Sequence, residues 1–210
     1  MKESILIIDF GSQVTKLIAR RIRELGVFSQ ILPYNELKKG EINKQEVKGI
    51  IFSGGPRSVD DKNAPKVENF IYDENIPILG ICYGLQLISK DFKGGVTPSN
   101  EREFGKTNLI QKKNSPLLDN VFLLKKTNQV WMSHSDKIMY LPKNFENLAS
   151  TDNCKYAVIQ NLKKKIFGVQ FHPEVVHTVG GKKLLSNFVK VICKCNQIWN
   201  MKFFKNKILL

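Results

Sequence analysis

The segment that most constrains the fold is an apolar run, residues 76–79, which leads into the pentapeptide Gly-Ile-Cys-Tyr-Gly at residues 80–84. A buried strand that ends in a tight turn, with glycine two residues before and after a thiol, has the pattern of a nucleophile elbow with sulfur in place of oxygen. Glycine is needed where other backbone passes close to such a turn. Residues 85–88 favour a helix start, whose positive dipole end stabilises a thiolate. The pentapeptide alone leaves open whether Cys82 is a nucleophile or a buried, unreactive cysteine.

The order of the elements around this turn predicts an α/β fold. Residues 5–9 are typical of a buried strand, and an amphipathic helix follows and ends at Gly26. A strand at 28–32 precedes the strands that end at Ser53 and Cys82. Because strands and helices alternate, we expect an open, mostly parallel sheet with helices on both faces. Beyond about residue 104, short strands predict an added antiparallel region, at 107–111, 121–124, 148–150, 156–160 and 166–171, before a last helix at 182–193.

A thiol nucleophile requires a base that also returns a proton to the leaving group, and the chain contains three histidines. His172 ends the predicted strand 166–171, at the carboxyl edge where open α/β sheets carry their sites. Pro173 keeps the residue before it extended, so His172 and Glu174 point to the same side. Glu174 can then orient the imidazole, which gives a Cys-His-acid set. By itself a His-Pro-Glu tripeptide is typical of an ordinary turn, and the cysteine elbow favours the catalytic interpretation.

A third segment offers hydrogen-bond donors for a developing oxyanion. Residues 48–52 are typical of a buried strand, which ends in Ser-Gly-Gly-Pro at residues 53–56. Glycines at a strand end let backbone N–H groups face a ligand, so we expect the N–H groups of Gly55 and Tyr83 to form an oxyanion hole. Taken alone, the Ser-Gly-Gly-Pro segment indicates a simple turn.

The 210 residues, 42% of them hydrophobic, can build one globular domain. We place this domain at residues 1–195, with a C-terminal extension at 196–210. Four cysteines are too few for a disulfide framework in a domain of this size, so we expect a reducing, cytoplasmic location. Cys193 and Cys195 have no second pair of ligands at a matching spacing, and we expect no metal site.

The net charge of +14 is a feature of many nucleic-acid-binding proteins. Here the basic residues are almost all lysine, and they are scattered over predicted loops and helix faces. We therefore expect no nucleic-acid partner. We also expect no membrane partner, because the longest uncharged apolar stretch, near residues 76–88, is too short to span a bilayer.

The elbow, the His-Pro-Glu segment and the Ser-Gly-Gly-Pro segment together resemble the class I glutamine amidotransferases, over nearly the whole chain. Residues 8–13, 130–134 and 168–175 resemble the glutaminase part of GMP synthetases. The resemblance implies Cys82 as the nucleophile, His172 as the acid and base, and Glu174 as the carboxylate that orients it. It also implies a glutamine pocket that includes Gly54, Gln86, Ser133, His134 and Ser135. Glycine is usual in the family at position 135, so the serine there is a departure that can narrow the pocket or disturb a turn.

By the same resemblance, the chain hydrolyses glutamine through a Cys82 thioester and passes ammonia to an ATP-dependent synthetase that aminates XMP to GMP. No phosphate-binding loop is evident, because Pro56 and Arg57 follow the glycines at 54 and 55. We therefore expect no cofactor in this chain, with ATP and magnesium only in the synthetase partner. Residues 196–210 resemble the linker that precedes this partner in fused enzymes, so the chain would be either a free subunit or part of a longer protein.

Two alternatives to this function stay open at the level of sequence. The first is the glutaminase of another amidotransferase, which feeds anthranilate, aminodeoxychorismate or carbamoyl phosphate synthesis. The second is a non-catalytic domain retained for docking, although the intact set of Cys82, His172 and Glu174 argues against it.

Overall fold

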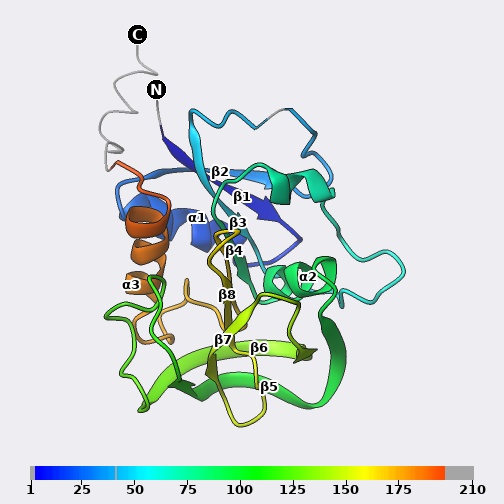
Figure 1. Cartoon of the computed structure of the whole chain (residues 1–210), viewed down its shortest axis with the longest axis vertical. Helices are drawn as coiled ribbons and strands as arrows, with labels where there is room; N and C mark the ends of the chain where they lie inside the picture. Colours follow the sequence, from blue (N-terminus) through cyan, green and yellow to red (C-terminus); the bar gives the residue numbers. More distant parts are fainter. Residues whose placement is uncertain (1–2, 41, 197–210) are drawn as a thin grey trace.

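The computed structural model describes residues 3–40 and 42–196. Within them, the strands form one nine-stranded sheet in the order β2-β1-β3-β4-β9-β8-β7-β5-β6 (Figure 1). One half of the sheet is parallel and contains β2 (Phe28–Pro33), β1 (Ser4–Asp9), β3 (Val47–Phe52), β4 (Ile78–Ile81) and β9 (Ile166–Val169). The other half is antiparallel and adds β8 (Val158–Asn161), β7 (Glu146–Ser150), β5 (Gly95–Gln111) and β6 (Thr127–Tyr140). This arrangement confirms the expected fold class.

Helices cover both faces of the parallel half (Figure 1). One face carries α1 (Thr15–Glu24), α3 (Gly181–Ser186) and the π-helical continuation η2 (Asn187–Ile192), and the other carries α2 (Tyr83–Asp91) and the 3-10 helix η1 (Asn69–Asp73). Strand β1 shows why both faces need a helical cover, because its successive side chains point to opposite faces of the sheet. Ile5 and Ile7 belong to the apolar core beneath α1 and α3, whereas Leu6 and Ile8 belong to the core beneath α2. Burial on both faces accounts for the continuous apolar runs in these strands.

The strand predicted at residues 121–124 is wrong, because this segment forms turns. Left-handed backbone at Asn120 (φ 53°) and Lys125 (φ 56°) bends the chain on either side of it. The Asn128 side chain closes the turn, since it accepts from the Leu123 N–H at 2.9 Å and donates to the Leu123 carbonyl at 3.0 Å. The run is apolar because Phe122 fills part of the core, and the antiparallel partner of β5 is instead the long strand β6.

Four of the parallel strands deliver their following loops to one edge of the sheet. A single cavity there is lined by Gly11 after β1, Gly55 after β3, Cys82 after β4 and His172 after β9. This convergence is the property of parallel α/β sheets that the sequence prediction relied on.

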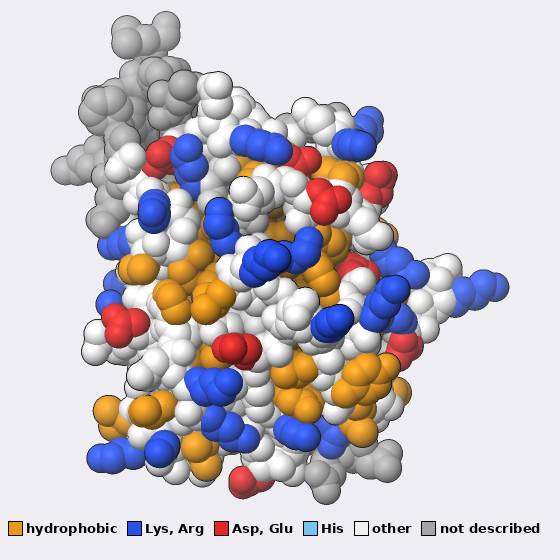
Figure 2. Space-filling view, in the orientation of Figure 1, with side chains coloured by type: hydrophobic (Ala, Val, Ile, Leu, Met, Phe, Trp, Pro, Cys, Tyr) orange, Lys and Arg blue, Asp and Glu red, His pale blue; other side chains and the backbone are white. Residues whose placement is uncertain are grey.

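No helix in residues 3–40 and 42–196 combines the length and the apolar character needed to cross a membrane. All four cysteines are free thiols. Lysine and arginine side chains are spread over the face seen in Figure 2, between apolar and acidic groups. The extension predicted at residues 196–210 lies almost wholly outside the described residues and stays a prediction.

Candidate active site

Cys82 occupies a strained turn between β4 and α2. Its backbone angles, φ 52° and ψ −105°, lie in a region that side-chain-bearing residues rarely adopt. Strain of this kind persists only where the surrounding structure enforces it, and it is frequent at functional sites. Two glycines make the turn possible. A Cβ atom at Gly84 would lie 2.5 Å from the backbone oxygen of Phe52, and one at Gly80 would lie 2.7 Å from the Gly84 backbone. The spacing of glycines around the cysteine thus follows from close backbone packing.

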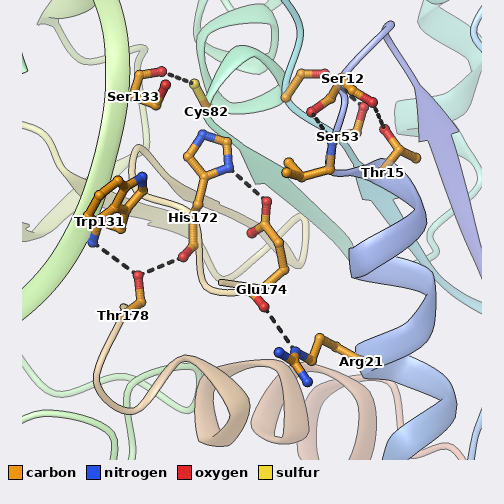
Figure 3. A network of polar contacts seen from close by, with 12 residues as sticks. Ser12, Thr15, Arg21, Ser53, Cys82, Trp131, Ser133, His172, Glu174 and Thr178 are labelled. Carbon is orange, nitrogen blue, oxygen red and sulfur yellow. Dashed lines mark hydrogen bonds and ion pairs between the residues drawn. The ribbon is translucent and has the colours of Figure 1, made fainter. Parts of the chain in front are cut away.

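His172 and Glu174 lie side by side in the loop that follows β9, as the sequence predicted (Figure 3). The imidazole Nδ1 is 2.7 Å from Glu174 Oε1, and both side chains are buried. Nδ1 is thereby engaged, so the opposite edge of the ring is left to face Cys82, as Figure 3 shows. Glu174 itself is held by Arg21 of α1, whose Nε donates to the Glu174 carbonyl at 3.0 Å.

The backbone around His172 is fixed by the neighbouring strand and loop. The His172 N–H donates to the carbonyl of Trp131 at 3.0 Å, and the His172 carbonyl accepts from the Thr178 hydroxyl at 2.6 Å. The same hydroxyl accepts from the Trp131 N–H at 3.0 Å (Figure 3). The imidazole is therefore held in place through both its side chain and its main chain.

Protonation of His172 is favoured by the two groups beside it. Burial alone would lower the pKa of His172, but hydrogen bonds to Cys82 and Glu174, the charge of the Glu174 carboxylate and the charge that Cys82 carries as a thiolate raise it from 6.5 to about 10. At neutral pH the ring is then an imidazolium, which can supply a proton to a leaving group.

This shift predicts how stability depends on pH. A group whose pKa is higher in the folded state binds more protons there, so its contribution is complete below the unfolded value and is lost as pH rises. We expect the free energy of unfolding to fall between pH 6.5 and about 10, with His172 contributing at most about 1.4 kcal/mol per pH unit. Free energies of unfolding, measured with denaturant at several pH values in this range, should fall with pH along a shallower slope for His172→Asn than for the wild type. An identical slope in the two proteins would contradict the assignment.

The Cys82 thiol faces two polar groups, one from strand β6 and one from the residue that directly follows β9. Its Sγ lies 3.6 Å from the Ser133 carbonyl of β6, to which the thiol donates, and 3.6 Å from Gln170 Nε2, which donates to the sulfur. Gly54 packs between the cysteine and the histidine, since a Cβ atom there would lie 3.3 Å from His172 Cε1 and 3.8 Å from Cys82 Cβ. The fold therefore brings together Cys82, from the turn after β4, with His172 and Glu174, from the loop after β9.

The two predicted oxyanion donors lie next to each other beside Cys82, since a Cβ atom at Gly55 would lie 3.2 Å from the ring of Tyr83. Tyr83 is the first residue of α2, so its N–H has no acceptor within the helix. Within residues 3–40 and 42–196, neither this N–H nor that of Gly55 makes a hydrogen bond. A side chain at position 55 would collide with the neighbouring strand end, because its Cβ would lie 2.9 Å from the Phe10 carbonyl oxygen. Both N–H groups are thus available to an anionic oxygen.

Two cavities meet at Cys82. One, of about 360 Å³, is the cavity at the sheet edge, and its wall also includes Ser12, Gln13 and Trp131. The other, of about 240 Å³, lies on the β6 side and contains four of the five residues predicted for the glutamine pocket: Gln86, Ser133, His134 and Ser135. The fifth, Gly54, contacts the histidine instead. Both ring nitrogens of His134 already have partners, Glu103 and the Asp136 carbonyl. His134 is therefore part of the cavity wall and has no ring nitrogen free to donate to a substrate.

Several residues that line these cavities, or that contact residues lining them, were not predicted from sequence. Ser12, Arg57, Trp131 and Asp136 line a cavity, Glu103 contacts His134, and Gln170 contacts Cys82. Gln170 stands two residues before His172, where the period of two along an extended chain could have indicated it. Glu103 comes from β5, and no spacing in the sequence relates it to His134. Its position depends on how β5 and β6 pair.

Comparison with known proteins agrees with this geometry. The family model described as glutamine amidotransferase class-I matches residues 6–192. The chain is 49% identical over 203 residues to a protein of Campylobacter jejuni named GMP synthase [glutamine-hydrolyzing], and this match covers 97% of the chain but 39% of the relative. A protein of the same name from Caldanaerobacter subterraneus is 47% identical over 200 residues, which cover 95% of this chain and 38% of the relative. The chain therefore spans less than half the length of these curated relatives.

Solved structures give the same result. A putative GMP synthase subunit protein from Thermoplasma acidophilum superposes with a TM-score of 0.83 at 31% identity, covering 99% of this chain and 98% of the other. A glutamine amidotransferase from Thermotoga maritima superposes with a TM-score of 0.74 at 16% identity, covering 93% of this chain and 100% of the other, which shows the shared fold alone.

Proposed function

Because the chain belongs to the class-I glutamine amidotransferase family, we propose that it is the glutaminase part of a GMP synthetase, with Cys82, His172 and Glu174 as its catalytic residues. The observation that carries the catalytic proposal is the strained elbow that presents Cys82 beside a buried His172–Glu174 pair at the meeting point of two cavities. A structural cysteine needs neither the strain nor the paired histidine.

In the proposed reaction, the Cys82 thiolate attacks the carbon of the glutamine side-chain amide. The N–H groups of Gly55 and Tyr83 stabilise the oxyanion that forms. His172 donates a proton to the amide nitrogen and the C–N bond breaks. Ammonia is released, and the substrate carbon remains bound to Cys82 as a thioester. A water molecule then gives a proton to His172 as its oxygen attacks the thioester carbon, the C–S bond breaks, and glutamate is released. Glu174 keeps the imidazole oriented through both steps.

The cavity on the β6 side is the proposed glutamine pocket. Its wall carries the Arg57 cation, in the loop that follows β3, and the Asp136 carboxylate of β6. The α-carboxylate and α-ammonium of free glutamine are complementary to these two charges. Gln86 helps to shape this pocket, because its Nε2 donates to the Asp136 carbonyl at 2.9 Å.

Removal of the Asp136 charge should weaken binding rather than chemistry. We expect Asp136→Asn to raise KM for glutamine by about tenfold or more while kcat changes little, since the lost ion pair is made in both the ground state and the transition state. Steady-state glutamate release measures both constants. Asp73→Asn, which removes an exposed carboxylate on η1, is the matched control. A loss confined to kcat would contradict the assignment of this pocket.

The GMP part of the proposal rests on the names and the identity of the relatives, which favour it over the other amidotransferase pathways. It implies an ATP- and magnesium-dependent synthetase partner that uses the ammonia to aminate XMP, and a cytoplasmic location. Mixing the chain with an ATP-pyrophosphatase-type GMP synthetase, XMP, ATP and magnesium should make GMP formation dependent on glutamine.

The controls for this experiment separate the two halves of the reaction. Without the chain, only added ammonium should support GMP formation. Glutamate release by the chain without any gain in glutamine-dependent GMP would keep the glutaminase assignment and would overturn the GMP assignment. Absence of glutamate release under every condition would overturn both.

A further inference from the structure

A second buried pair of a carboxylate and an imidazole lies close to the proposed glutamine pocket, outside the group formed by Cys82, His172 and Glu174. Glu103 of β5 stands directly opposite His134 of β6 in the antiparallel ladder. Glu103 Oε2 is 3.1 Å from His134 Nε2, and the two side chains are 4% and 2% exposed. Burying such a pair is costly unless every remaining polar atom finds a partner, so the surroundings of this pair indicate what it is for.

Each member of the pair is held from its far side as well. His134 Nδ1 lies 2.9 Å from the Asp136 carbonyl, and because a carbonyl only accepts, Nδ1 must carry a proton. Glu103 Oε1 accepts from the Thr151 hydroxyl at 2.8 Å, and that hydroxyl accepts from the Cys154 N–H at 2.9 Å. The carboxylate therefore fixes the orientation of the ring, and the ring in turn holds the Asp136 carbonyl.

The Asp136 carbonyl connects this pair to the nucleophile. It also accepts from Gln86 Nε2 at 2.9 Å, and the same nitrogen donates to Gln170 Oε1 at 3.2 Å. Gln170 Nε2 donates to Cys82 Sγ at 3.6 Å. A continuous series of buried hydrogen bonds thus runs from Glu103 to the sulfur.

A second connection is the strand itself. The Ser133 carbonyl, which accepts from the Cys82 thiol, directly precedes His134 in β6. Residues 133–136, here called the β6 wall, therefore touch the thiol at one end and Gln86 at the other, and all four line the cavity on the β6 side. Ser133, His134 and Asp136 pair with β5, and the register between the two strands shifts between Pro98 and Glu103, so the pair of Glu103 and His134 lies at the edge of this irregularity.

We propose that Glu103 is a positioning residue for glutamine binding, which acts through His134 to hold the β6 wall against Cys82 and Gln86. The inference rests on the proposed glutaminase function and deepens it. Glu103 does not touch substrate in this arrangement. Its carboxylate holds the imidazole, the imidazole holds the Asp136 carbonyl, and the position of that carbonyl determines the shape of the pocket.

The test is to replace the carboxylate by an amide of nearly equal shape. Glu103→Gln retains the volume and the contact to Thr151 but removes the charge that pairs with His134. We expect KM for glutamine to rise by about tenfold, since a charge-assisted hydrogen bond is lost, while kcat falls by no more than about threefold. Thr151→Val, which replaces the hydroxyl that steadies Glu103 and also frees the Cys154 N–H, should raise KM in the same direction by a smaller factor. Glu36→Gln, at an exposed carboxylate, is the matched control.

A binding measurement that does not depend on turnover completes the test. Glutamine should protect Cys82 from alkylation by iodoacetamide, and the glutamine concentration that gives half protection should rise in Glu103→Gln by the same factor as KM. A folded Glu103→Gln protein with unchanged KM and unchanged protection, even if it unfolds more easily, would overturn the proposal. Failure of the wild type to release glutamate would instead overturn the proposed function.

The same side chains suggest one further control. The ligand atoms of Glu103, His134 and Cys154 lie within 4.8 Å of one another, close enough to share a metal ion. If the hydrogen bonds described above are what holds the pocket, dialysis against EDTA should leave KM unchanged in the wild type. An increase in KM that zinc reverses would overturn the positioning role as stated.

Discussion

Replacement of Cys82 by alanine should abolish glutamine hydrolysis, with kcat reduced by about 10⁴-fold or more. The proposed reaction passes through a bond between Sγ and the substrate carbon, and no other described thiol lines either cavity that meets at this position. The remaining groups, His172 and the two oxyanion N–H groups, could at most assist direct attack by water. Release of glutamate from glutamine, followed with a coupled assay, measures the effect.

The control for this variant is the loss of a different buried thiol. Cys193 directly follows η2 and packs against Gly49 in the first half of β3. The cavity at the sheet edge that contains Cys82 instead lies beyond the carboxyl ends of the parallel strands. Cys193→Ala should therefore retain kcat and KM while losing some stability through the small cavity it leaves. Glutamine should also yield a covalent thioester, detectable by mass spectrometry after acid quench, in the wild type but not in Cys82→Ala. Appreciable turnover by Cys82→Ala would rule out the nucleophile assignment.

Replacement of His172 by asparagine should have the second-largest effect, with kcat lower by about 10³- to 10⁴-fold. Asparagine places an amide nitrogen close to the position of Nδ1, so it can keep the hydrogen bond to Glu174. It lacks the ring edge that faces Cys82, and with it the proton that the leaving ammonia requires. Because the raised pKa keeps the ring protonated to about pH 10, the wild type has this proton available at neutral pH.

This variant differs from Cys82→Ala in a way that can be measured. The thiol is still present, so iodoacetamide should still alkylate Cys82 in His172→Asn. Any thioester that does form should persist, because no base activates water against it. His177→Asn, at an exposed histidine in the same loop, is the matched control and should retain activity. A His172→Asn protein with kcat near that of the wild type would exclude this histidine as the acid and base.

The sequence predicted most completely those parts of the site that depend on short segments. The elbow could be predicted because a strained turn after a buried strand needs glycine at Gly80 and Gly84, and both glycines are visible in the sequence. The pair of His172 and Glu174 could be predicted because the two residues are only two apart after a strand end, although residues 173 and 174 form a turn and not the extended chain that the prediction assumed. The parallel half of the sheet could be predicted because strands buried on both faces leave continuous apolar runs.

The antiparallel half was predicted less well, for a related reason. Residues 121–124 are as apolar as a strand, but the chain turns on both sides of them, and only the fold shows that Phe122 serves as a core residue. Strands β5 and β6 are long, and β6 carries buried and exposed side chains of many types. Their pairing places Glu103 opposite His134, which is 31 positions away in sequence, and no local sequence pattern predicts a contact over such a separation.

By itself, the sequence determined the family, the elbow, and the three residues proposed for catalysis, because each of these depends on residue types at short, fixed spacings. Only the tertiary structure showed the cavity on the β6 side of Cys82 that we propose as the glutamine pocket, that both nitrogens of His134 are already engaged, and that Glu103 stands behind it. The physical reason is that these properties depend on pairing between strands far apart in the chain. Such pairing is set by burial of the whole sheet and not by any one segment.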